Sequence, residues 1–226
     1  KSSGVDLVTE VDHYSEQYLI TALRHTYPQH AILSEEQGQQ IGHSEYLWII
    51  DPLDGTTNYA QGLPIFSISI ALQYRGQTVM GVVYAPVVDQ IFTAIRGKGA
   101  FLNGKPIAVS KKTELGQCVL ATGFPYDRAT HPDNNVNYFA HFTPRVRGIR
   151  RMGSAAYDLA NVASGALDGY WELNLSIWDV AAGALLVEEA GGKVVYLPKK
   201  RGVSLVAGNP AMCERILTEM AMVDAD

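Results

Sequence analysis

The pattern of apolar residues changes near residue 112, and this change limits the folds open to the chain more than any other feature. Residues 66–86 and 90–110 alternate apolar and polar positions between glycine-rich turns, which predicts antiparallel strands, with a hairpin turn at Arg75–Gly76. After residue 112, strand-like runs alternate with helix-like runs. We therefore predict an α+β chain with an antiparallel-sheet half in residues 1–112 and an α/β half in residues 113–226.

Apolar spacing also predicts the other elements. A helix is expected over residues 11–28, where apolar residues recur at helical spacing up to Pro28, and a short buried strand over residues 46–51. The second half is predicted to contain strands at 118–123, 167–173, 193–197 and 204–209 and helices at 155–166, 180–192 and 210–223. The stretch 126–151 is polar and interrupted by prolines, so no element is predicted there.

The composition bounds the class of protein. With 226 residues, 47% of them hydrophobic, the chain can bury a sizeable core in one domain or two closely packed halves. A net charge of −5 without long Lys/Arg runs argues against nucleic-acid binding. No apolar run reaches the roughly 20 residues of a membrane-spanning helix, and Cys118 and Cys213 have neither disulfide nor metal spacing. We therefore expect a cytoplasmic protein without nucleic-acid or membrane partners.

Two acids follow a buried strand in the stretch "IIDPLDGTTNY". Pro52 disfavours the helical conformation at Asp51, and the chain then turns, so that Asp51, Asp54 and the Leu53 carbonyl can face one space. Such an oxygen-only set suits Mg²⁺ or Mn²⁺. The alternative is a plain type I turn with Asp at its first position. The apolar residues before Asp51 favour the metal site, because an unpaired charge at a buried strand edge is costly.

Two further segments are suited to binding an anion. Gly55, Thr56 and Thr57 offer free amides and hydroxyls at the start of a turn, and Gly153 and Ser154 stand at the start of a predicted helix. The alternative for each segment is an ordinary helix cap.

Three other acids are candidates for the same site. Glu35 follows the apolar pair Ile32–Leu33, Glu172 ends a predicted strand, and Asp179 stands at a predicted helix N-cap. Each also has a simpler interpretation. Glu35 could be a solvated charge, Glu172 a surface acid at a strand end, and Asp179 only a helix cap. Neither a Gly-x-Ser-x-Gly elbow nor a Walker loop occurs, which argues against a serine hydrolase or a P-loop enzyme.

Taken together, these motifs resemble the inositol monophosphatase family of metal-dependent, lithium-sensitive phosphatases. The matching segments are "DLVTEVD" (6–12), "SEEQG" (34–38), "WIIDPLDGTTNY" (48–59), "GSAAYDLA" (153–160) and "WDVAAGALLVEEAGG" (178–192). The resemblance covers nearly the whole chain and implies a layered αβαβα sandwich of the sugar-phosphatase type that forms a homodimer. This sequence departs from the family pattern in two places, since it does not contain the helix that usually precedes "KSSGVDLVT" (1–9) and its loop 196–202 is short. Either this member is trimmed at these places, or segments of it lie outside this sequence.

The resemblance also implies roles for individual residues. Two or three Mg²⁺ ions, with Mn²⁺ as a possible substitute, would activate a water that attacks phosphorus in line. The implied metal ligands are Glu35, Asp51, the carbonyl of Leu53, Asp54 and Asp179, with Asp51 bridging two ions. The implied catalytic residues are Glu35, Thr56 and Asp12, the last two hydrogen-bonded so that Thr56 orients the water. The implied substrate contacts are Asp54, Gly55, Thr56, Gly153, Ser154, Ala155, Glu172 and Asp179. Lys1 matches a family lysine near the active-site loop.

The expected substrate is a small phosphorylated polyol, above all inositol 1-monophosphate. Histidinol phosphate, fructose 1,6-bisphosphate and adenosine 3′,5′-bisphosphate are alternatives on the same scaffold. The cluster Arg145, Arg147, Arg150 and Arg151 is either a site for a second phosphate or a solvated face. An alternative of another class is a non-catalytic regulatory protein, but such a protein should have lost ligands, and here every acid of the pattern is present.

Overall fold

The computed structural model describes residues 9–40, 44–199 and 201–225. In the N-terminal half, eight strands form one sheet in the order β2-β1-β3-β4-β5-β6-β7-β8. They are β1 (Ala31–Ser34), β2 (Gly38–Gln40), β3 (Tyr46–Asp54), β4 (Ser67–Tyr74), β5 (Gln77–Ala85), β6 (Gln90–Ile95), β7 (Ala100–Leu102) and β8 (Lys105–Pro106). The predicted hairpin between β4 and β5 is confirmed. The expectation of a wholly antiparallel sheet is corrected at one pair, because β1 and β3 run parallel.

A second, five-stranded sheet lies in the C-terminal half. Its strands follow the order β10-β9-β11-β13-β12. They are β9 (Val119–Thr122), β10 (Gly148–Arg150), β11 (Gly169–Leu175), β12 (Lys193–Tyr196) and β13 (Val203–Gly208). β9 pairs in parallel with β10 and β11, whereas β13 is antiparallel to β11 and β12, so this sheet is mixed too.

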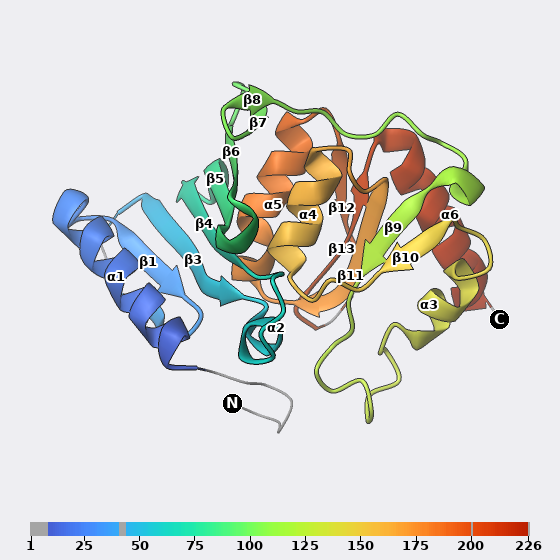
Figure 1. Ribbon diagram of the computed structural model, residues 1–226, viewed down its shortest axis with the longest axis horizontal. Helices are drawn as coiled ribbons and strands as arrows, with labels where there is room; N and C mark the ends of the chain where they lie inside the picture. Colours follow the sequence, from blue (N-terminus) through green and yellow to red (C-terminus); the bar gives the residue numbers. More distant parts are fainter. Residues whose placement is uncertain (1–8, 41–43, 200, 226) are drawn as a thin grey trace.

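Helices cover and separate the two sheets. They are α1 (Glu10–Thr26), α2 (Thr56–Ala60), α3 (Val136–Phe142), α4 (Ala155–Ala163), α5 (Ile177–Glu189) and α6 (Pro210–Ala225), with short 3₁₀ turns η1 (Pro86–Val88) and η2 (Leu115–Gln117). In Figure 1, α4 and α5 lie between the sheets, α1 lies outside the first sheet, and α3 and α6 lie outside the second. This is the predicted layered αβαβα arrangement. Within the described residues, we find no helix with the length and apolar character to cross a bilayer.

The central layer explains why α5 has so few polar residues. Every position from Val180 to Val187 is buried, because α5 packs against β4 and β5 on one side and β12 and β13 on the other. Gly183 allows the close approach of α4, since a Cβ there would lie 2.6 Å from the Cβ of Leu159. One core cluster contains residues of both halves, such as Val83 and Leu205. A division into subdomains at residue 112 therefore stays a prediction.

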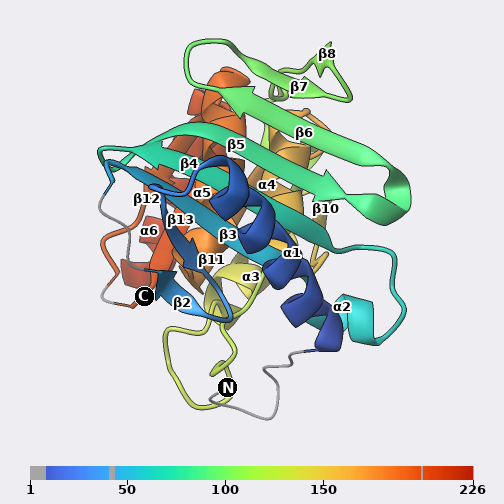
Figure 2. The same ribbon diagram turned by 90° about the vertical axis from the view of Figure 1, so that its left-hand side faces the viewer.

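On its outer side, the first sheet carries α1. Figure 2 shows this helix crossing the face of the sheet near β3. Ile20 of α1 packs with Ile32, Trp48 and Ile50 in a small separate core. This packing holds α1 beside the ends of β1 and β3, where two of the predicted site motifs begin.

Two local expectations were wrong. Ser176, not Asp179, is the N-cap of α5, and Asp179 is its third helical residue. Glu172 lies inside β11 and not at its end, because the strand continues to Leu175. Both errors concern the ends of elements, which depend on tertiary packing as well as on local sequence. The stretch 126–151, for which the sequence resolved no element, contains α3 and β10.

Candidate active site

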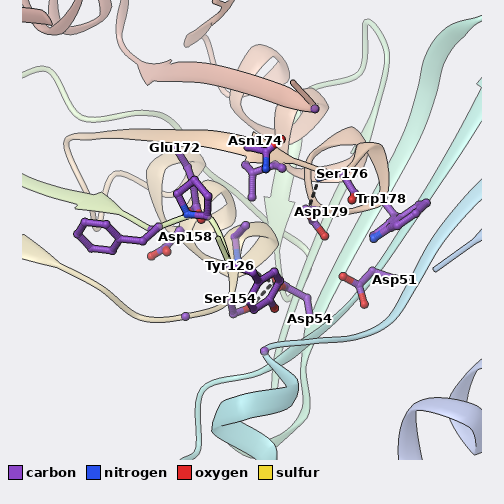
Figure 3. Close-up of a pocket in the computed structure, with 18 of the residues that line it drawn as sticks. Asp51, Asp54, Tyr126, Ser154, Asp158, Glu172, Asn174, Ser176, Trp178 and Asp179 are labelled. Atoms are coloured by element: carbon purple, nitrogen blue, oxygen red, sulfur yellow. Dashed lines mark hydrogen bonds between the residues drawn. The ribbon is translucent and has the colours of Figure 1, made fainter. Parts of the chain in front are cut away.

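A pocket of about 570 Å³ opens where the ends of β3 and β11 meet the first turns of α4 and α5 (Figure 3). All the predicted site residues except Asp12 line this pocket. They are Glu35, Asp51, Leu53, Asp54, Gly55, Thr56, Gly153, Ser154, Ala155, Glu172 and Asp179. Residues from both halves of the chain are therefore brought together in one cavity, as the prediction of a shared site requires.

Asp51 is the most enclosed acid at the β3 end of the pocket. It is 2% exposed, and its Oδ1 accepts a hydrogen bond of 3.0 Å from the N–H of Leu53. Burial raises the pKa of Asp51 well above its usual value, and repulsion from Asp54, Glu35 and Asp179 raises it further. A carboxylate in this position would be stabilised by any bound cation.

The carboxylate of Asp54, the last residue of β3, accepts hydrogen bonds from the start of α4. Its Oδ2 accepts hydrogen bonds of 2.7 Å from both the hydroxyl of Ser154 and the N–H of Ala156, and its Oδ1 accepts one of 3.2 Å from the N–H of Ala155. Burial still raises the pKa of Asp54, although these bonds oppose the shift. The N–H of Ala155, a residue that the family resemblance implied as a substrate contact, here donates to Asp54.

Asp179 and Glu35 are the other two acids that line the pocket near Asp51 and Asp54. The Oδ2 of Asp179 accepts a 2.7 Å hydrogen bond from the N–H of Ser176, so the carboxylate is held at the first turn of α5. Burial raises the pKa of Asp179 well above its usual value, with repulsion from Asp54, Glu35 and Glu172 acting in the same direction. Figure 3 shows Asp179 and Asp51 extending toward one space from opposite walls.

The donor chemistry of this end suits a hard divalent cation. Carboxylates and a carbonyl are the ligands that Mg²⁺ and Mn²⁺ prefer, and mutual repulsion among buried acids is relieved by a cation. Across the parts of the chain that the structure describes, no group of three or more Asp, Glu, His or Cys side chains is already arranged to hold a metal ion. Mg²⁺ usually keeps several waters and takes only one or two carboxylates, so it does not need such a cage. The individual ligand assignments stay predictions.

Helix α1 supports the loops that carry these acids. The carboxylate of Asp12 is fully buried, and its Oδ1 lies 2.9 Å from the Oγ1 of Thr56. The same hydroxyl lies 3.1 Å from the carbonyl oxygen of Leu53, and either acceptor can take its single proton. One turn further along, the hydroxyl of Ser15 donates to the carbonyl of Pro52 at 2.8 Å.

Glu16 is a supporting residue that the sequence analysis missed. It is fully buried, and its Oε1 accepts hydrogen bonds from the hydroxyl of Ser34 and from the N–H groups of Glu36 and Gln37, the last two at 3.0 and 3.1 Å. These donors surround Glu35 in sequence, so Glu16 holds the turn that presents Glu35. An acid four residues after Asp12, on the same face of a helix, was the available signal.

Glycines allow the two anion-binding segments to approach each other. Gly55 has φ +101°, a left-handed conformation that favours glycine, and a Cβ there would lie 3.1 Å from the carbonyl oxygen of Gly153. The side-chain amide of Asn58 donates to the carbonyl of Met152 at 2.6 Å and links the same two segments. The first turns of α2 and α4 are therefore held side by side.

A second pair of acids lies at the opposite end of the pocket (Figure 3). Glu172 accepts a 2.5 Å hydrogen bond from the hydroxyl of Tyr170, and burial raises the pKa of Glu172 to about 7. Gly123 leaves space for this carboxylate, since a Cβ there would lie 2.0 Å from Oε1. Asp158 of α4 also lines the pocket and is 1% exposed. Sequence analysis missed Asp158, although the only acid in the predicted helix 155–166 was a usable signal.

The basic residues contribute little to this pocket. Arg151 lines it, whereas Arg145, Arg147 and Arg150 are not among its lining residues and are exposed. The latter three therefore match the solvated face that was the alternative to a second phosphate site. Lys1 lies outside the described residues.

Comparisons with known proteins agree on the family. The model of the inositol monophosphatase family matches residues 1–223. The chain is 47% identical over 225 residues to a Pseudomonas aeruginosa protein named Nus factor SuhB, covering 94% of this chain and 82% of the relative. A solved inositol monophosphatase from Anabaena (Nostoc) sp. PCC 7120 superposes with a TM-score of 0.91 at 46% identity, over 95% of this chain and 87% of that one. A solved structure of SaIMPase-II with bound inositol monophosphate has a TM-score of 0.83 at 28% identity, over 96% and 87% of the two chains.

Proposed function

Because this chain belongs to the inositol monophosphatase family, we propose that it is a metal-dependent phosphatase acting on phosphate monoesters. The observation that carries the proposal is the gathering of Glu35, Asp51, Asp54 and Asp179 in one pocket beside the first turn of α4. Acids that repel one another at close range need a cation, and a phosphate ester brought to such cations would meet the helix terminus.

The chain's own residues would perform three tasks. Glu35, Asp51, Asp54, Asp179 and the Leu53 carbonyl would hold the ions. When bound, Mg²⁺ would supply the positive charge that acidifies water and stabilises a phosphoryl group during transfer. Thr56, held by Asp12 at 2.9 Å, would orient the attacking water through its hydroxyl.

We favour a phosphorylated polyol with one phosphate, such as inositol 1-monophosphate, as the substrate. Arg151 is the one basic residue among the described residues that line the pocket, so a second phosphate would find little charge there. Glu172 at the far end offers acceptors for hydroxyl groups. The solved relative that binds inositol monophosphate supports the same substrate class.

The test is a phosphate-release screen of purified protein over inositol 1-phosphate, histidinol phosphate and fructose 1,6-bisphosphate, with and without Mg²⁺ and Li⁺. We expect Mg²⁺-dependent release from inositol 1-phosphate, inhibited by Li⁺. Asp51→Asn should lower turnover by about three orders of magnitude while the far-ultraviolet spectrum stays unchanged. Near-normal Mg²⁺-dependent turnover by this variant would contradict the proposed role of Asp51.

A non-catalytic regulatory role is the second candidate, and one observation favours it. Several relatives at 43–47% identity carry the name Nus factor SuhB, which does not describe a phosphatase. The acids of the pocket are all present in this chain, and they support catalysis instead. Mg²⁺ binding without phosphate release from any ester of the screen would favour the regulatory role.

A further inference from the structure

Residues 124–134, between β9 and α3, form a loop that makes one side of the pocket. Figure 1 shows this loop projecting from the body of the molecule. Its residues that line the pocket are Phe124, Pro125, Tyr126 and Asp127. Tyr126 is 58% exposed and lies among the residues drawn in Figure 3. The proposed chemistry gives the loop no role, although it forms part of the cavity wall.

The two ends of the loop are anchored to each other and to the second sheet. Asn135 is fully buried, and its side-chain amide donates to the carbonyl of Gly123 at 2.5 Å and to the hydroxyl of Thr122 at 2.8 Å. The indole N–H of Trp171 donates to the Oδ1 of Asn135 at 2.7 Å. Closely held ends are typical of an Ω-loop, and such a loop can move as one unit about them.

The middle of the loop is compact but has little apolar packing. The N–H groups of Thr130 and His131 donate to the carbonyl of Asp127 at 2.9 and 3.0 Å, so this part is held together by its own backbone. Residues 126–130 are all exposed, and exposed side chains gain little from the hydrophobic effect. The position of the loop over the pocket therefore depends mainly on polar contacts.

Ion pairs supply such contacts, and they join the loop to the segment before β13. The guanidinium of Arg201 donates two hydrogen bonds, of 2.8 and 3.0 Å, to the carboxylate of Asp127. The ammonium of Lys199 donates to the Oδ1 of Asp133 at 3.2 Å. Hydrogen bonding from Arg201 lowers the pKa of Asp127, so this pair stays charged at neutral pH.

The segment that carries Arg201 is itself fixed at the pocket. Its neighbour Gly202 lines the pocket and has φ +48°. A Cβ at Gly202 would lie 2.7 Å from both the carbonyl oxygen of Leu175 and the Oδ1 of Asn174, so the backbone lies against the end of β11. The loop is therefore tied at Asp127 to a segment that packs on the second sheet.

Resting on the proposed phosphatase function, we propose that residues 124–134 are a lid over the pocket and that Arg201 is the positioning residue that holds the lid closed through Asp127. A closed lid keeps Tyr126 at the pocket and retains the bound substrate. Opening would remove part of the cavity wall, so the substrate would dissociate faster and KM would rise. The predicted metal ligands lie outside the lid, so kcat should change little.

The kinetic test compares Arg201→Ala with wild type on inositol 1-phosphate in Mg²⁺. We expect KM to rise about fivefold and kcat to stay within about twofold, because one exposed ion pair is lost. Arg75→Ala is the matched control, since it removes an exposed ion pair with Glu45 and neither residue lines the pocket. Asp127→Asn keeps the shape of the side chain and should match Arg201→Ala, also if the latter folds poorly. Exchanging the two charges, in Asp127→Arg with Arg201→Asp, should return KM toward the wild-type value.

Limited digestion with trypsin tests the lid without turnover. Arg128 is exposed in the middle of the loop, and trypsin cleaves a folded chain after a segment opens. Cleavage after Arg128, followed by mass spectrometry, should be about fivefold faster in Arg201→Ala than in wild type or Arg75→Ala. Added salt should speed cleavage of wild type more than that of Arg201→Ala, because salt screens the ion pair that the variant lacks.

Three results would overturn the proposal. A KM and a cleavage rate of Arg201→Ala equal to those of Arg75→Ala would show that Arg201 does not hold the loop. A lower kcat with unchanged KM would indicate a structural effect on the metal site instead. A charge-exchanged variant with a KM no lower than that of the single variants would show that the ion pair does not act. A wild type that releases no phosphate refutes the proposed function itself, and the cleavage rates then decide alone whether Arg201 holds the loop.

Discussion

Substituting Gly123 by alanine tests how closely the pocket is built around Glu172. A Cβ at this position would lie 2.0 Å from Oε1 and 2.3 Å from both Cδ and Oε2 of Glu172. Gly123 does not have a left-handed φ, so the backbone itself tolerates alanine. The effect of the substitution must therefore come from the collision with the carboxylate.

The required displacement follows from these distances. Ordinary contact begins at 3.4 Å, so the carboxylate must move by the difference between 3.4 and 2.0 Å, about 1.4 Å. A shift of that size strains or breaks the 2.5 Å hydrogen bond from Tyr170. A misplacement of about 1 Å in an active site can cost about 10²-fold in rate, and overpacking costs about 1–3 kcal/mol of stability. We expect losses of this order in kcat/KM for inositol 1-phosphate and in the free energy of unfolding.

The assay combines steady-state kinetics with urea unfolding of Gly123→Ala. Propyl phosphate serves as the second substrate, and its kcat/KM should fall much less than that of inositol 1-phosphate. Gly116→Ala is the matched control, because nothing lies within 4 Å of a Cβ there. If Gly123→Ala matched Gly116→Ala in both kinetics and unfolding, the inferred packing of Glu172 against Gly123 would be wrong.

Three further predictions concern the buried acids. Glu16→Ala leaves three hydrogen-bond donors without their acceptor, so the free energy of unfolding should fall by about 3 kcal/mol. Because Glu16 holds the turn that presents Glu35, more Mg²⁺ should also be needed for half-maximal activity. Equal unfolding midpoints for this variant and for the exposed control Glu10→Ala would contradict the prediction. The pKa of Glu172 is about 7 in the folded chain, against 4.5 in the unfolded chain. Between these two pH values the folded chain therefore keeps a proton on Glu172 that the unfolded chain has lost. The contribution of Glu172 to metal-free stability should therefore fall by about 3 kcal/mol as the pH rises from 4.5 to 7. Glu172→Gln should lessen the slope of the unfolding free energy against pH, measured by urea unfolding at several pH values, and an unchanged slope would count against the shift. At pH 8, Mg²⁺ should raise the melting temperature of wild type because it relieves the repulsion among the acids around Asp51. Asp51→Asn should lose much of this increase, and an equal increase in both proteins would argue against Asp51 as a metal ligand.

Local sequence predicted most helices and strands and the residues of one motif. The hairpin at Arg75–Gly76 could be predicted because turn chemistry and period-two alternation act within a few residues. Asp51, Leu53 and Asp54 could be predicted to share a space for the same reason. The N-cap of α5 could not be placed, because Ser176 and Asp179 are both acceptable caps and only the path of β11 decides between them.

The sequence by itself determined most of the elements and, through its family pattern, the layered fold, and it predicted the chemical type of the site. Tertiary structure alone decided that Asp54 meets Ser154, 100 residues away, that Glu16 holds the Glu35 turn, and that Asp158 is buried beside Glu172. The physical reason is the sequence distance over which each effect acts. Helix and strand propensity and hydrophobic periodicity act over a few neighbouring residues. The burial and hydrogen bonding of a side chain depend instead on the distant segments that the two sheets bring to the same pocket.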